Sequence, residues 1–136
     1  MPLCLRFTAP AAALALAASF SLGVAWSGSS PSFAQLTQER VDAAGKAFTQ
    51  YEAQYKSGRT AVESVYVWSV RWYDAQGGRK AGAGPANDHL KRMQVLEGAV
   101  KSNQQAGIAS GADAAAAAYY RAEAELWAVE ARGGKP

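Results

Sequence analysis

Two stretches of the chain repeat the same arrangement of an apolar-striped helix, a glycine and a hydroxyl residue, and this pattern limits the possible folds most. Gly58 and Gly107 lie 49 residues apart, and each follows apolar side chains at helical spacing. Thr60 and Ser110 follow within three residues, and either can accept a hydrogen bond from the first amides of a new helix. Because each hairpin must bury its apolar face, the two are expected to pack together. Low identity leaves chance similarity as the alternative origin of the repeat.

The first predicted hairpin covers residues 37–76. In its first helix, about residues 37–55, apolar side chains recur in alternating steps of three and four, which is the seam of a helix packed lengthwise on a partner. These side chains are Val41, Ala44, Phe48, Tyr51 and Tyr55. Thr37 is expected to cap the helix, and Gly58 to end it, because glycine readily adopts the left-handed conformation of a helix C-terminus.

The second helix of this hairpin, about residues 61–76, is harder to assign. Thr60 and Glu63 form a capping-box pattern at its start. The segment from Val65 to Tyr73 is nevertheless rich in β-branched and aromatic residues, which favour strands. The capping pattern, the glycines on both sides and a length of about four turns favour a helix, which is our prediction.

A glycine-rich stretch, 77–84, is expected to form a flexible connector to a second hairpin at 85–131. Pro85 suits the first position of the third helix. The predicted seam of that helix is Leu90, Met93, Leu96 and Val100. Gly107 is expected to end it, and Ser110, with an acidic residue three positions later, to cap a fourth helix. The chain is therefore expected to be all-α, with two antiparallel hairpins forming a four-helix bundle.

Residues 1–34 have the pattern of an export signal. Arg6 is the only charge before Glu39 and precedes an apolar run at 11–24. This run is shorter than the roughly 20 residues of a membrane-spanning helix. We therefore predict a signal peptide and an exported chain, periplasmic or extracellular, with a retained membrane anchor as the alternative.

The cleavage site follows from the small residues that a signal peptidase reads. Residues 32–34 (Ser-Phe-Ala) have small side chains at the two positions that matter, so cleavage before Gln35 is predicted. Ala25 is a second candidate. Cleavage before Gln35 would leave a single helical domain at 35–136.

The charged and nucleophilic residues give little support to catalysis. A formal charge of +3 is too small for the basic patch of a nucleic-acid-binding protein. One Cys and one His exclude a disulfide framework, a Cys/His zinc site and c-type haem attachment. His89 is expected to lie solvated on a helix surface, while Glu123 and Glu125 are spaced to point to different sides of a helix. We predict a protein that is not an enzyme and uses no cofactor or metal.

Aromatic side chains form the predicted partner-binding site. They exceed what a short bundle is expected to bury, and a surplus at the surface would suit a protein partner or self-association, because Trp, Tyr and Arg concentrate binding energy. Core packing is the alternative for the same residues. Contact with a membrane is not predicted, since the polar faces carry both signs of charge. The predicted patch comprises Tyr66, Trp68, Arg71, Trp72, Tyr73, Tyr119, Tyr120 and Trp127.

The hairpin pattern resembles the helical repeat of TolC-type outer-membrane efflux proteins. Residues 55–65 (Tyr-Lys-Ser-Gly-Arg-Thr-Ala-Val-Glu-Ser-Val), with Ala-Gln at 75–76, are similar to one copy, and residues 107–113, followed by 119–125, to the other. The resemblance covers about 38–131 and implies a hairpin module in an envelope efflux or transport assembly. The chain departs from the family because it is short and has no alternating strands for a barrel wall. A complete efflux channel is therefore not expected.

A second similarity is to small periplasmic chaperones of the Spy/CpxP type. Leu36 and Thr37 open an exported helical chain as the Leu-Thr-x-x-Gln motif of those proteins does. Here the fifth residue is Arg40, and the motif occurs once. This resemblance implies an alternative function, the binding of unfolded client proteins. The principal prediction is a non-enzymatic exported protein that acts through protein–protein contacts.

Overall fold

The computed structural model describes residues 30–133, and those from Pro31 onward belong to one compact unit. This part is helical, as predicted. Its elements are α1 (Phe33–Lys56), α2 (Val62–Ala75), the short 3₁₀ helix η1 (Gly78–Ala81), α3 (Ala83–Gln105) and α4 (Gly111–Ala131). The segment from Val65 to Tyr73, which could have formed a strand, lies within α2. Most of the predicted export signal lies outside the described residues.

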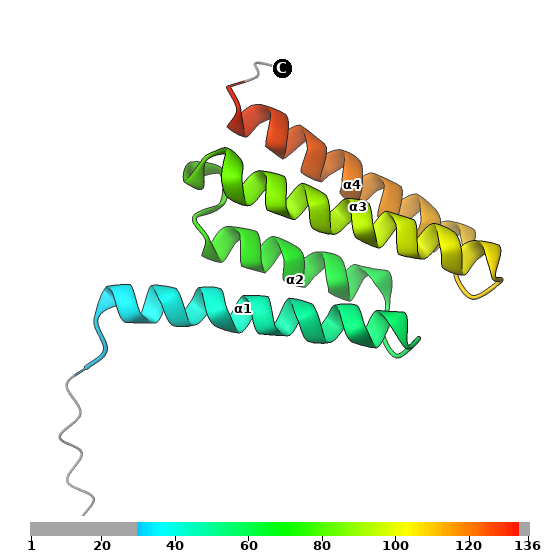
Figure 1. Ribbon diagram of the computed structural model, residues 1–136, viewed down its shortest axis with the longest axis horizontal. Coiled ribbons are helices and arrows are strands. Elements are labelled where there is room, and N and C mark those ends of the chain that lie inside the picture. The colour runs from blue at the N-terminus through cyan, green and yellow to red at the C-terminus, as the bar shows by residue number, and fades with distance from the viewer. Residues whose placement is uncertain (1–29, 134–136) are drawn as a thin grey trace, which may run out of the picture. The chain divides into compact units, whose positions relative to one another are not determined.

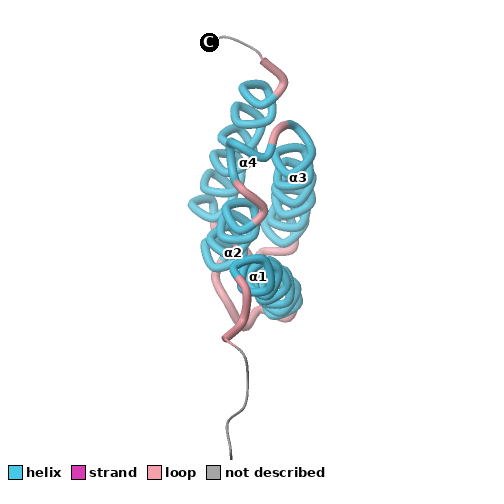
Figure 2. The backbone as a smooth tube through the Cα atoms, turned by 90° about the vertical axis from the view of Figure 1, so that its left-hand side faces the viewer, coloured by secondary structure: helices cyan, strands magenta, loops and turns pink. Residues whose placement is uncertain are grey.

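The helices pair as two antiparallel hairpins, α1 with α2 and α3 with α4 (Figure 1). α2 joins the pairs through its contacts with α3 and α4, while α1 and α4 lie on opposite sides of the arrangement (Figure 2). All four helices contribute to one buried cluster, so the hairpins share an interior. The cluster contains Phe48, Tyr55, Val62, Val65, Met93, Leu96, Val100, Ala117 and Ala124.

The two long helices that open the hairpins end in the same way. Gly58 and Gly107 have φ values of 70° and 73°. The amides of the following residues, Arg59 and Ile108, each donate to a carbonyl five residues earlier at 2.8 Å. This is the Schellman ending of a helix, which requires the left-handed conformation that glycine adopts without strain. The predicted helix ends are confirmed, and the repeat in the sequence corresponds to a repeat in backbone geometry.

The start of α1 differs from the prediction. Ser32 caps the helix: its hydroxyl accepts a hydrogen bond from the Gln35 amide at 3.2 Å, and the Gln35 side-chain oxygen accepts one from the Ser32 amide at 2.7 Å. Thr37, the predicted cap, lies inside the helix, where its hydroxyl donates to the Phe33 carbonyl at 2.8 Å. A complete capping box at Ser32 satisfies more of the free amides than Thr37 alone would.

The capping box predicted from Thr60 and Glu63 is wrong. The N-cap of α2 is Ala61, which makes no side-chain capping bond. The prediction for α4 is confirmed: the Ser110 hydroxyl accepts from the Asp113 amide at 3.1 Å, and the Asp113 carboxylate accepts from the Ser110 amide at 2.9 Å. Ala61 and Ser110 are each the third residue after a glycine, so the backbone repeat holds even though the capping chemistry does not.

The connector between the hairpins is more ordered than predicted, because η1 occupies part of it. Gly77, Gly78 and Gly82 all have positive φ there, which lets the chain turn sharply between α2 and α3. α3 begins at Ala83, so Pro85 is its third residue and not its first.

Within residues 30–133, no helix combines the length and apolar character needed to cross a membrane.

Candidate functional site

The eight residues of the predicted aromatic patch are spread over two sides of α2. Trp68, Arg71 and Trp72 lie toward α1, Tyr66, Tyr73, Tyr120 and Trp127 lie where α2 meets α3 and α4, and Tyr119 lies on the exposed face of α4. Tyr73 is only 2 % exposed and belongs to the core, whereas Tyr119 is 62 % exposed. Five of the eight are on α2, where positions 66 to 73 point in several directions around the helix.

On the first side, aromatic contacts hold α1 against α2. Trp68 stacks on Tyr51 with ring centroids 5.8 Å apart, and the guanidinium of Arg71 lies 4.6 Å from the Trp68 ring. Trp72 packs against Phe48 at 5.7 Å in a tilted arrangement. The Arg71 guanidinium therefore makes a cation–π contact within the same helix.

On the second side, α2 is joined to α4. Tyr66 and Tyr120 stack face to face with centroids 3.9 Å apart. The Tyr66 hydroxyl donates to one oxygen of Glu123, and the Tyr119 hydroxyl donates to the other at 3.4 Å. Burial raises the pKa of Tyr66 above its ordinary value, and the bond to Glu123 raises it further. The phenol therefore stays protonated and remains a donor at physiological pH.

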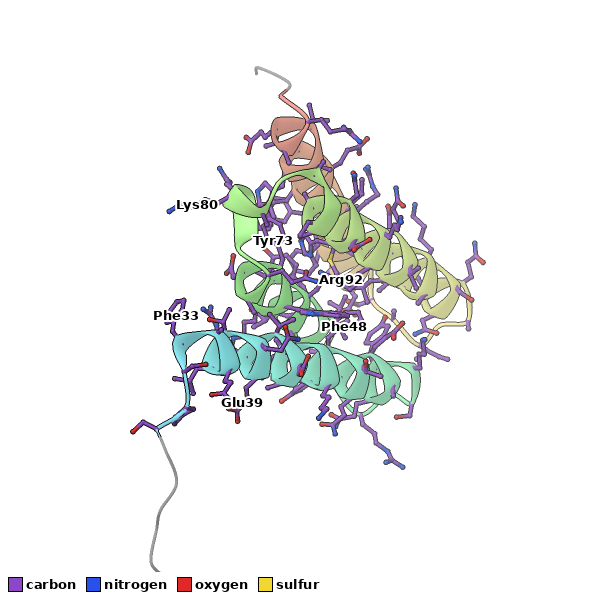
Figure 3. The ribbon with its side chains drawn as sticks, turned by 60° about the vertical axis from the view of Figure 1, so that its left-hand side comes forward. Phe33, Glu39, Phe48, Tyr73, Lys80 and Arg92 are labelled. Carbon is purple, nitrogen blue, oxygen red and sulfur yellow. The ribbon has the colours of Figure 1, made fainter. Side chains whose placement is uncertain are left out.

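A buried polar cluster of Ser69, His89 and Arg92 joins α2 to α3. His89 is 0 % exposed, so the prediction of a solvated surface histidine is wrong. Its Nδ1 lies 2.8 Å from the Ser69 hydroxyl, which also accepts a hydrogen bond from Arg92 Nε at 2.7 Å. Arg92 reaches from α3 toward Phe48, while Tyr73 points into the same interior (Figure 3).

The surroundings of the cluster fix its charges. Burial, together with the nearby Arg92 guanidinium, lowers the pKa of His89 to about 4. Burial lowers the pKa of Arg92 to about 10, against an opposing effect of Asp88. His89 is therefore neutral and Arg92 positive at physiological pH. A Ser69 hydroxyl that accepts from Arg92 can donate its own hydrogen to Nδ1, which assigns the imidazole hydrogen to Nε2.

Aromatic rings enclose this cluster. Tyr73, His89 and Trp127 stack pairwise with centroid separations of 5.3 to 5.6 Å. The Arg92 guanidinium lies 4.5 Å from the Trp72 ring, which offers the negative face that a buried cation needs. The cluster therefore links three helices through one set of contacts.

The pairing of Ser69 with His89 has the distance of a nucleophile and its base. Both residues are fully buried, however, and Arg92 already binds the oxygen that would have to attack a substrate. Within residues 30–133, no three His, Cys, Asp or Glu side chains come together as a metal site. The arrangement is suited to holding helices together and not to turning over a substrate.

The surface has three grooves beside the N-terminal half of α1, and two of them include residues of the predicted patch. One, of about 650 Å³, has Val41, Gly45 and Trp72 among its lining residues. The other, of about 350 Å³, is on the opposite side of the helix and includes Trp68 and Arg71. Three residues of the predicted patch thus line grooves that a partner could reach.

Comparisons with known proteins do not add to this assignment. No family model, curated protein or solved structure matches the chain. The functional conclusion therefore depends on the geometry of the described residues.

Proposed function

We propose that this chain is an exported, non-enzymatic helical protein that acts through protein–protein contacts, as a TolC-like hairpin module in an envelope assembly. The shared core of the two hairpins supports the architecture of a four-helix bundle. The apolar run at 11–24 supports export through a signal peptide. The polar groups most able to do chemistry, on Ser69 and His89, are enclosed in the interior.

The observation that carries this proposal is the exposed start of α1. Cleavage before Gln35 leaves 22 of the 24 residues of this helix, whereas the antiparallel α2 has 14, so about 12 Å of α1 extends past its neighbour. Leu36, which is 49 % exposed, lies on this extension and remains after cleavage before Gln35. Exposed apolar side chains on an extended helix are typical of a contact surface.

The larger groove on this helix suits an amphipathic helix of a protein partner. Val41 and Trp72 offer apolar surface. The Trp72 indole is accessible because Gly45, which lies next to the ring, has no side chain to cover it. Asp42 and Lys46 on the rim carry opposite charges that could meet the polar flanks of such a helix.

Site-specific photo-crosslinking in the cell envelope tests this function. A crosslinker at Thr49, which lines the groove, should capture a defined partner, and Val41→Glu should abolish the capture. The matched position is Gln54, which is exposed on the same helix outside the described grooves. Equal capture at both positions, or capture at neither, would contradict a partner site in the groove.

A chaperone of unfolded clients is the second candidate, favoured by the exposure of Leu36 on the same helix as two apolar grooves. This function predicts that the chain suppresses aggregation of a client at a near-equimolar ratio and that Val41→Glu weakens the effect. No suppression by the unaltered chain would remove the candidate.

A further inference from the structure

Helix α4 is apolar on two opposite faces. Its inner face contributes Ala117, Ala124 and Ala128 to the core. Its outer face repeats apolar residues in steps of three and four, and all of them are exposed: Ala112, Ala115, Tyr119, Ala122, Leu126 and Val129. Exposed apolar side chains that follow one another along a helix are typical of an interaction surface. No other helix of the described residues covers this face, although Arg79 of η1 borders it beside Tyr119, and α4 lies at the edge of the arrangement (Figure 1).

We propose that this outer face is the interface of an antiparallel homodimer, in which α4 packs lengthwise against α4 of a second copy. Steps of three and four are the spacing of a two-helix seam. This proposal identifies a second copy of the chain as one protein partner, so it rests on the proposed function of acting through protein–protein contacts.

The sizes of the side chains support a second copy in antiparallel orientation. The seam begins with two alanines and ends with Leu126 and Val129, and its two central positions are Tyr119 and Ala122. With a twofold axis near the middle of α4, Val129 meets the partner's Ala112, Leu126 meets the partner's Ala115, and Tyr119 meets the partner's Ala122. Each layer then holds one large and one small side chain, which keeps the helix separation even. A parallel pair would place alanine on alanine at one end and leave a gap there.

The charges beside the seam select the same register. In the proposed pairing, Glu123 faces the partner's Ala116, and Glu125 faces the partner's Ala118. If one helix slid along the other by one heptad in one direction, Glu123 would face the partner's Glu123, and Glu125 would face the partner's Glu125. Repulsion between these like charges disfavours that register. A shift in the other direction would carry Leu126 past the start of the partner's α4.

A groove at the centre of the seam fits the same pairing. It measures about 380 Å³ and is lined in part by Tyr119, Ala122 and Leu126. The proposed register brings the partner's Tyr119 to Ala122, so this large side chain would enter the groove. The aromatic ring would then be covered in the dimer, although it is exposed in the single chain.

Sedimentation velocity of the purified chain over a range of concentrations tests the dimer. The unaltered chain should approach the mass of a dimer, and Leu126→Glu should raise the Kd by about tenfold or more, because a buried leucine becomes a charge. Val95→Glu is the matched control, since Val95 is 58 % exposed on α3, away from the seam. Circular dichroism should show the same helix content in all three. A monomer at every concentration, or unchanged association of Leu126→Glu, would overturn the dimer.

Disulfide trapping tests the register. In the processed chain, which lacks Cys4, chains with Ala115→Cys and chains with Leu126→Cys should cross-link only when the two are mixed. Cross-linking of Leu126→Cys with itself would show parallel packing and overturn the register. A monomeric chain that still captures a partner from Thr49 would overturn the dimer alone, whereas a monomer that captures nothing would overturn the proposed function as well.

Discussion

At the scale of single residues, the Ser69 hydroxyl connects the buried polar cluster, because it makes hydrogen bonds with both His89 and Arg92. Ser69→Ala should lower the free energy of unfolding by about 2 kcal/mol, since it leaves buried polar groups unsatisfied. Urea denaturation measures the change. Ser64→Ala, on the same helix and partly exposed, should change stability by less than about 0.5 kcal/mol. Equal stability of the two variants would contradict the role of the cluster.

The buried imidazole predicts a dependence of stability on pH. The pKa of His89 is about 4 in the folded chain and 6.5 as the ordinary value. Between these values the unfolded chain binds a proton that the folded chain does not, so the free energy of unfolding should fall as the pH falls from 6.5 to 4. The loss should be on the order of 3 kcal/mol.

His89→Asn removes the titrating group while keeping a polar side chain near Ser69. Thermal or urea unfolding at several pH values should show that the slope between pH 6.5 and 4 disappears in this variant. Hydrogen bonds from Ser110 lower the pKa of Asp113 below 3.8, so that carboxylate titrates outside this window. An unchanged slope in His89→Asn would contradict the assignment to the imidazole.

The position of His89 could have been read from the sequence spacing. The buried positions of α3 are Ala86, His89, Met93, Leu96 and Val100, which follow steps of three and four without a break. The predicted seam used Leu90 in place of His89 because leucine is the more apolar residue. Residue type outweighed periodicity there, although a histidine that makes a hydrogen bond can occupy a core position. Its hydrogen-bond partner Ser69 is on α2, and nothing in the sequence alone would have linked the two residues.

At the scale of helices, the two capping boxes should differ in their effect on stability. Ser110→Ala should cost about 1 kcal/mol, because α4 packs into the core from its first turns. In the uncleaved chain, Ser32→Ala should leave global stability unchanged, because the first turns of α1 have exposed side chains and can fray locally. Urea denaturation compares the two variants. A similar cost at both caps would show that the extension of α1 is coupled to the core.

Two helical glycines provide a second matched pair. Gly98 has open space around it, so Gly98→Ala should stabilise the chain by about 0.7 kcal/mol through helix propensity. At Gly45 an added Cβ would lie 3.1 Å from the Trp72 ring, so Gly45→Ala should lose most of this gain. Melting temperatures report the difference. An equal gain at both positions would contradict the close packing of Gly45 on the indole.

Helix ends were predictable where backbone conformation decides them. Gly58 and Gly107 end their helices as expected, because the left-handed conformation favours glycine. The start of α2 was not predictable from residue type, because Thr60 lies one position before the actual cap. The repeat contained the missing information: adding 49 to Ala61 gives Ser110, the cap that was identified correctly.

At the scale of the whole described chain, the number of helices and their pairing follow from apolar spacing and glycine positions. The placement of α1 opposite α4 does not, because four apolar stripes do not specify which stripes meet. The outer seam of α4 and the extension of α1 have the same origin: each is apolar surface that the shared core leaves uncovered. The proposed contacts depend on that core being common to both hairpins.

Circular dichroism of the two hairpins, prepared separately as residues 31–76 and 77–133, tests this common core most directly. Each hairpin alone should be weakly helical, because it leaves its side of the core in water, and mixing should restore the helical signal. If each half were fully helical alone, unfolded cooperatively and did not change on mixing, the two hairpins would not depend on each other.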